Sequence, residues 1–106
     1  MPKFLIQAKY TPEGMKGLVQ DSASGRRADV TTAVKALGGK VEAFYYVLGD
    51  EDAVAILDLP DNTSAAAFAV ATTGTGAVRV RTTPLLTVEE VDQALEIQPK
   101  YRAPGS

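Results

Sequence analysis

The chain has 106 residues, of which 45% are hydrophobic and 23% are charged, and its 13 acidic and 11 basic side chains give a net charge of −2. This length predicts one globular domain, and this composition excludes a disordered or fibrous chain. The chain has no cysteine and no histidine, which excludes disulfides, thiolate catalysis, histidine-based triads and structural zinc, and an acidic chain is not expected to bind nucleic acid.

The first half of the chain predicts a strand followed by two helices. The strand spans Lys3–Tyr10, and Thr11-Pro12-Glu13 is a typical helix start with Thr as the N-cap and Pro in the first turn. Ser22–Gly25 interrupts the helical pattern, and a second helix continues to the stop signal Gly38-Gly39. No apolar run approaches the ~18 residues of a membrane span and no signal-peptide pattern is present, so we expect a cytoplasmic protein without a membrane partner.

The second half predicts a β-hairpin, a helix, a strand and a terminal helix. Two stretches rich in β-branched and aromatic residues flank a polar turn over residues 49–52. The predicted elements are, in order, strands over Val41–Leu48 and Ala53–Leu59, a helix from Pro60 to Thr73 and a strand over Ala77–Thr83. Thr87 and Glu90 form a capping box, so a terminal helix follows them.

This order of elements, β-α-β-β-α-β, is typical of a ferredoxin-like α+β sandwich. We therefore predict a ferredoxin-like domain with a C-terminal helix over residues 1–97, followed by an extended tail over residues 98–106 that is rich in Pro and Gly.

Strand alternation sorts the side chains of the predicted sheet onto two faces. The set expected under the helices is nearly all apolar: Phe4, Ile6, Ala8, Val41, Ala43, Tyr45, Val47, Val54, Ile56, Val78 and Val80. The set expected on the second face is mixed: Leu5, Gln7, Lys9, Phe44, Tyr46, Leu48, Ala53, Ala55, Leu57, Arg79 and Arg81. In the matching hairpin register, Tyr46 faces Ala55 and Phe44 faces Leu57.

The second face is too apolar for bare solvent and too charged for a simple core. One interpretation is that it meets a second subunit, so that the protein forms a homodimer or a higher oligomer. The alternative is a half-hydrated face on which the arginine side chains lie flat.

Several short motifs resemble those of the GYD-domain family over nearly the whole chain: Tyr10-Thr11-Pro12-Glu13-Gly14, Leu37-Gly38-Gly39-Lys40, Gly49 with Asp52, Leu59-Pro60-Asp61-Asn62 and Thr82-Thr83-Pro84-Leu85-Leu86-Thr87. The resemblance implies a ferredoxin-like fold similar to the dimeric α+β-barrel proteins, and it implies no particular activity. The family's namesake pattern has Tyr before the Asp of the hairpin, whereas this chain has Glu51 at that position.

The turn between the two hairpin strands carries three carboxylates in a row, Asp50, Glu51 and Asp52. In the predicted topology this turn lies at the same edge of the sheet as Tyr10 and the loop Gly74-Thr75-Gly76. Neighbouring carboxylates can serve as a general acid or base, but consecutive ones lack the spacing of a metal cage. We predict no metal site and no cofactor, and a solvated polar turn is the simpler interpretation.

A group of cationic and polar side chains is expected on the second sheet face. Charged groups beside a phenol and an amide suit a carboxylate or phenolate, so we predict an anion-binding site made of Gln7, Lys9, Tyr46, Arg79 and Arg81. The alternative is that these cations pair with Glu42 or with acids of a partner subunit.

Two functions follow from these residues. The first is a homo-oligomeric binding or accessory protein that accommodates a small organic anion at the sheet face. The second is a cofactor-independent lyase, isomerase or oxygenase in which Tyr46, Lys9 or Asp52 handles protons. The sequence leaves open whether the protein is an enzyme.

Overall fold

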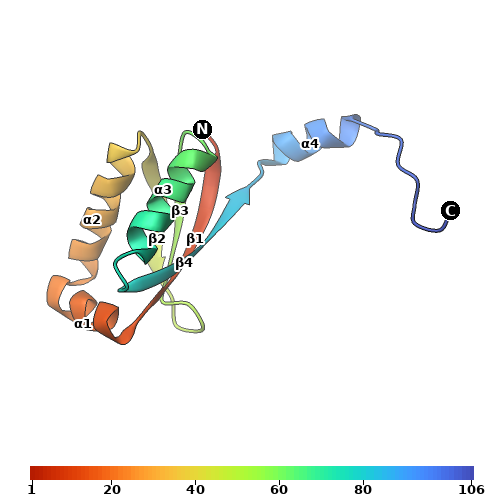
Figure 1. The fold of residues 1–106 in the computed structure, drawn as a ribbon. Coiled ribbons are helices and arrows are strands. Elements are labelled where there is room, and N and C mark those ends of the chain that lie inside the picture. Colours follow the sequence, from red (N-terminus) through yellow and green to blue (C-terminus); the bar gives the residue numbers. More distant parts are fainter.

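The computed structural model covers residues 1–106 and has the predicted order of elements (Figure 1). The strands are β1 (Lys3–Tyr10), β2 (Lys40–Tyr46), β3 (Ala53–Asp58) and β4 (Val78–Leu85). The helices are α1 (Pro12–Asp21), α2 (Ala23–Ala36), α3 (Asn62–Thr73) and α4 (Val88–Glu96). The four strands form one antiparallel sheet in the order β2-β3-β1-β4, which confirms the ferredoxin-like α+β fold.

Side-chain caps start the helices at the positions that the sequence predicts. The Thr11 hydroxyl accepts a hydrogen bond from the Gly14 amide at the start of α1, and Thr87 and Glu90 form both halves of the capping box before α4. These bonds satisfy amides that the first helical turn leaves without partners. Gly14 is also required by packing, because a Cβ atom there would overlap the carbonyl oxygen of Ala77.

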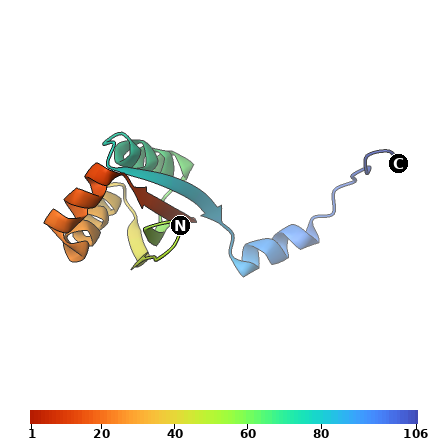
Figure 2. The ribbon, with the colours of Figure 1, turned by 90° about the horizontal axis from the view of Figure 1, so that it is seen from below.

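One face of the sheet is covered by α2 and α3, and α1 lies at one end of the sheet, beside the start of α2 (Figures 1 and 2). The core forms where these helices meet the strands, and its buried residues are Phe4, Ile6, Val34, Ala55, Leu57, Leu59, Ala65 and Phe68. No helix covers the opposite face, which we call the open face.

The structure corrects the expected sorting of β2 and β3 onto the two faces. Tyr46 pairs with Ala53 and Phe44 with Ala55, and both alanines pair with β1 residues of the helix-covered face. The residues expected under the helices but lying on the open face are Ala43, Tyr45, Val54 and Ile56. Those expected on the second face but lying under the helices are Phe44, Tyr46, Ala53, Ala55 and Leu57.

In β2 the cause of this reversal is a local irregularity, whereas the faces of β3, expected to follow those of β2, are set by its pairing with β1. The pairing of β2 with β3 shifts between Val41 and Ala43, and one additional residue in a strand moves every later side chain to the other face. Val41 itself packs against the core as expected.

The C-terminal part of the chain departs from the domain. Only Leu86 and Thr87 separate β4 from α4, and α4 and the tail after it extend away from the sheet (Figures 1 and 2). No helix in the structure has the length and apolar character needed to cross a membrane.

Candidate functional site

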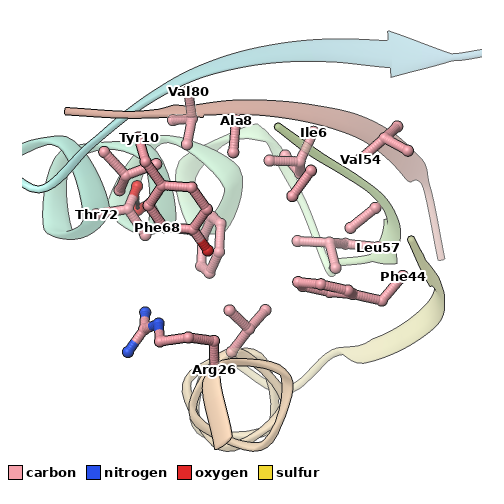
Figure 3. A pocket seen from close by; sticks show the side chains of 14 residues that line it. Ile6, Ala8, Tyr10, Arg26, Phe44, Val54, Leu57, Phe68, Thr72 and Val80 are labelled. Carbon is pink, nitrogen blue, oxygen red and sulfur yellow. Dashed lines mark hydrogen bonds between the residues drawn. The ribbon is translucent and has the colours of Figure 1, made fainter. Parts of the chain in front are cut away.

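A pocket of about 50 Å³ lies between the helix-covered face of the sheet and the helices α2 and α3 (Figure 3). Its lining is apolar apart from a few groups, and consists of Ile6, Ala8, Tyr10, Arg26, Val30, Phe44, Ala53, Val54, Ala55, Leu57, Phe68, Thr72, Val78 and Val80. Figure 3 shows Arg26 extending from α2 along the side of the pocket on which Tyr10, Phe68 and Thr72 lie. An apolar chamber with a few polar groups at one end is the usual form of a small-molecule site.

The polar groups of this pocket differ in how many of their hydrogen-bond donors already have partners within the chain. The Thr72 hydroxyl lies within 2.9 Å of the Phe68 carbonyl oxygen, so its proton is used inside α3. Arg26 Nη1 lies 3.1 Å from an Asp29 carboxylate oxygen and 3.7 Å from Asp21. A guanidinium has five N–H donors in a planar fork, so these two contacts through one nitrogen leave donors of Arg26 for a ligand.

Hydrogen bonds to the backbone of β1 fix the position of Tyr10 at the edge of the pocket. Its amide donates a 2.8 Å hydrogen bond to Asp52 Oδ2, and the Asp52 amide donates to the carbonyl of Ala8. Next to Tyr10, the Thr11 hydroxyl lies within hydrogen-bond distance of the Gly76 carbonyl. The sheet edge therefore brings together β1, the hairpin turn and the loop before β4, which confirms the predicted neighbourhood.

A wider, more polar groove of about 350 Å³ adjoins the apolar pocket. The groove lies among α1, α2 and α3, includes Glu13 and Asp21, and has five lining residues in common with the pocket: Tyr10, Arg26, Phe68, Thr72 and Val78. Tyr10 and Arg26 thus stand between an apolar inner chamber and a polar outer one.

Tyr46 lies close to this boundary. Its hydroxyl donates a hydrogen bond of 3.2 Å to the Ala23 carbonyl in the first turn of α2. Burial, and after it the neighbouring Tyr10, raises the pKa of Tyr46 above 10.0, although Arg26 and Arg27 act in the opposite direction. The phenol is consequently protonated near neutral pH, where it can donate a hydrogen bond and cannot act as a base.

Four of the five residues predicted to bind an anion do lie together on the open face. Lys9 pairs with Arg79 and Gln7 with Arg81 across β1 and β4, and these four line one shallow depression with Glu51 and Val80. The predicted inclusion of Tyr46 is wrong, because the register of β2 places its side chain on the opposite face of the sheet.

The cations of the open face already have partners in part. Arg81 Nη2 lies 3.0 Å from Glu51 Oε1, and Lys9 Nζ donates to the Asp50 carbonyl at 2.9 Å. Arg79 forms no ion pair within the chain. The depression is therefore less strongly cationic than the sequence suggests.

The three candidate catalytic residues do not converge. Tyr46 lies on the helix-covered face, Lys9 lies on the open face, and the Asp52 carboxylate accepts the Tyr10 amide. No group of three or more Asp or Glu side chains is arranged to hold a metal ion.

The sequence places Tyr10 at the edge of the sheet beside the hairpin turn, but it assigns neither Tyr10 nor Arg26 to a binding site. A signal for Arg26 was present, because Arg26, Val30 and Val34 follow one another at four-residue spacing and so share one face of α2. A cation at the head of an apolar helix stripe indicates a polar group at the edge of a core. For Tyr10 the sequence indicated only its place at the end of β1.

Comparison with known proteins gives one match. The model of the GYD domain family matches residues 4–95, which include β2, β3 and β4 and nearly all of β1 and α4. No curated protein and no solved structure matches the chain.

Proposed function

This chain belongs to the GYD domain family, and we propose that it binds a small, largely apolar organic acid in the pocket between the sheet and the helices α2 and α3. The observation that supports this proposal is the composition of the pocket, in which Arg26 and Tyr10 are the polar groups at one end of an otherwise apolar lining. Such a site suits a ligand that has one apolar end and one charged end.

The two ends of the ligand have different partners. Its ring or short alkyl chain enters the inner chamber and contacts Phe44, Leu57 and Phe68, where burial of apolar surface supplies about 25 cal/mol per Å². Its carboxylate, phenolate or enolate stays at the boundary, where Arg26 and the hydroxyl of Tyr10 can donate hydrogen bonds. The inner chamber is small, so the head group remains at this boundary, short of Glu13 and Asp21 in the outer groove.

We place the anion here rather than on the open face because of the degree of enclosure. On the open face Arg81 is paired with Glu51, and only one of the six residues that line the depression is hydrophobic. Arg26 is also paired with acids and its side chain is 31% exposed, but 12 of the 14 residues that line the pocket are hydrophobic, and a charge-assisted hydrogen bond is stronger in apolar surroundings.

We favour a binding protein over the enzymatic alternative because the residues required for that chemistry are dispersed. Lys9 and Tyr46 lie on opposite faces of the sheet, and the Asp52 carboxylate is engaged by a backbone amide. Tyr46 also keeps its proton near neutral pH. A general base for an enolisable substrate would need a group that is free and close to the bound ligand.

The proposal is tested by calorimetric and NMR titration of the full chain with benzoate, hexanoate and the uncharged benzamide. We expect the two acids to bind more tightly than benzamide and to shift the amide signals of Tyr10, Arg26 and Phe68. Arg26→Gln should weaken benzoate binding about ten- to a hundredfold, the scale of one hydrogen bond to a charged group.

Arg27→Gln is the matched control, because Arg27 is the next residue on α2 and does not line the pocket. The proposal is wrong if both variants lose affinity equally, if benzamide binds as well as benzoate, or if the shifted amides cluster around Gln7 and Arg79 instead.

A further inference from the structure

The chain exposes more surface than a compact monomer of its mass. Its accessible surface is 7427 Å², whereas a folded monomer of 11.2 kDa exposes about 5,700 Å². Its radius of gyration is 17.1 Å, against about 13 Å for a compact domain of this length. The excess of roughly 1,700 Å² is larger than the ~800 Å² that each partner buries in a standard protein interface.

Part of this excess lies on α4, which carries two adjacent stripes. Val88, Val91 and Leu95 form an apolar stripe at helical spacing, and Val88 and Leu95 are 74% and 69% exposed. The next residue in the sequence after each of these three is acidic. These residues form a second, acidic stripe beside the apolar one: Glu89, Asp92 and Glu96. The helix has no basic residue. An amphipathic helix with an exposed apolar stripe requires a partner surface in order to be stable.

The open face of the sheet carries an apolar band and, beside it, a cationic band, which complement the apolar and acidic stripes of α4. Leu5 pairs with Ile56, and Ile56 pairs with Ala43, so an apolar band crosses the strands. On the side of this band towards the hairpin turn, Lys9 and Arg79 pair with each other across β1 and β4. Arg79 has no acidic partner within the chain.

We propose that the α4 helix of each chain packs on the open sheet face of a second copy, so that two chains exchange their C-terminal helices in a closed homodimer. The apolar stripe of α4 covers the apolar band around Leu5 and Ile56 of the other copy. The acidic stripe then lies beside Lys9 and Arg79 of that copy, where opposite charges are brought together.

The connection before α4 favours packing of α4 on a second copy over packing of α4 on its own sheet. Leu86 and Thr87 alone link β4 to α4, and the capping box fixes the start of the helix at Thr87. In both views α4 points away from its own sheet (Figures 1 and 2). The length of the apolar stripe, about 10 Å from Val88 to Leu95 at 1.5 Å per residue, fits within the width of a four-stranded sheet, about 15 Å.

The mass in solution is the first test. Sedimentation of the full chain at tens of micromolar should give twice 11.2 kDa, and a monomer at that concentration overturns the proposal. Val91→Asp with Leu95→Asp should convert the dimer to a folded monomer, because the variant places charges in the apolar contact. Val19→Asp is the matched control, since Val19 is 81% exposed on α1 and lies outside the proposed contact. A double variant that remains dimeric also overturns the proposal.

A charge exchange between chains tests which surfaces meet. Arg79→Glu and Asp92→Arg should each weaken self-association, on the order of tenfold or more, because each places like charges together. A mixture of the two variants restores opposite charges in both contacts of a heterodimer, so the mixture should associate more tightly than either variant alone. If the mixture behaves like its components, or if another surface forms the dimer, the proposed contact is wrong.

Discussion

The two faces of the sheet use the same four strands in opposite ways. Along β3, Leu57 has no exposed surface under the helices, whereas its neighbour Ile56 is half-buried on the open face. The covered face combines Leu57 with the small residues Ala53 and Ala55, which line the pocket between the sheet and the helices. The open face instead has the β-branched residues Val54 and Ile56 of β3, together with cations from β1 and β4.

This difference teaches that residue size alone does not identify the core of a single chain. A β-branched residue such as Ile56 is expected to be buried, and in this protein it is available for burial by another surface. The stability of the isolated chain therefore depends mainly on one face, and the other face is free for the proposed association.

The difference between the two faces is tested most directly by shortening two side chains that are neighbours in β3 but lie on opposite faces. Leu57→Ala should lower the free energy of unfolding by about 2–5 kcal/mol, because it leaves a cavity among fully buried residues. Ile56→Ala should change the stability of the dilute chain by roughly 1 kcal/mol or less, because its side chain is already in contact with water. Denaturant unfolding at low protein concentration measures both values.

The same pair of variants distinguishes folding from association. At high protein concentration Ile56→Ala should weaken the dimer, while Leu57→Ala should act equally at all concentrations. Equal losses for both variants in the dilute chain would show that the open face is part of the folding core.

A smaller effect is expected at the sheet edge that both faces share. Asp52→Ala removes the acceptor of the Tyr10 amide and should destabilise the chain by about 1.5–3 kcal/mol, the range for a hydrogen bond to a charged group. Asp50→Ala is the control, since Asp50 contributes only its backbone carbonyl to the contact with Lys9. Thermal unfolding compares the two, and a larger loss for the Asp50 variant would contradict the assignment.

The smallest effect concerns alkaline pH. The raised pKa of Tyr46 means that the folded chain keeps this proton to a higher pH than the unfolded chain does. The resulting stability is present below about pH 10 and is lost as the pH rises through the folded-state pKa. Tyr46→Phe should flatten this alkaline decline, whereas Tyr45→Phe on the open face should retain it. Unfolding measured from pH 8 to 11 tests the difference.

Much of the architecture follows from local signals in the sequence. The order of elements, the caps at Thr11 and Thr87 and the faces of β1 and β4 were all predictable, because caps and regular alternation are short-range properties. The gathering of Lys9, Arg79 and Arg81 was predictable for the same reason.

The errors arose where one residue changes the geometry of everything after it. The irregularity between Val41 and Ala43 reverses the faces of β2, and no residue type in that segment marks it. Tyr46 was therefore assigned to the wrong face, and the pocket beside Arg26 was not foreseen. Glu51, at the position where the family motif has Tyr, supplies the ion pair to Arg81 instead.

The sheet order also has a consequence for synthesis of the chain on the ribosome. β1 lies between β3 and β4, so it gains its second neighbour only when β4, near the other end of the chain, has emerged. Until then the edge of β1 has free amides and carbonyls that can pair with another nascent chain.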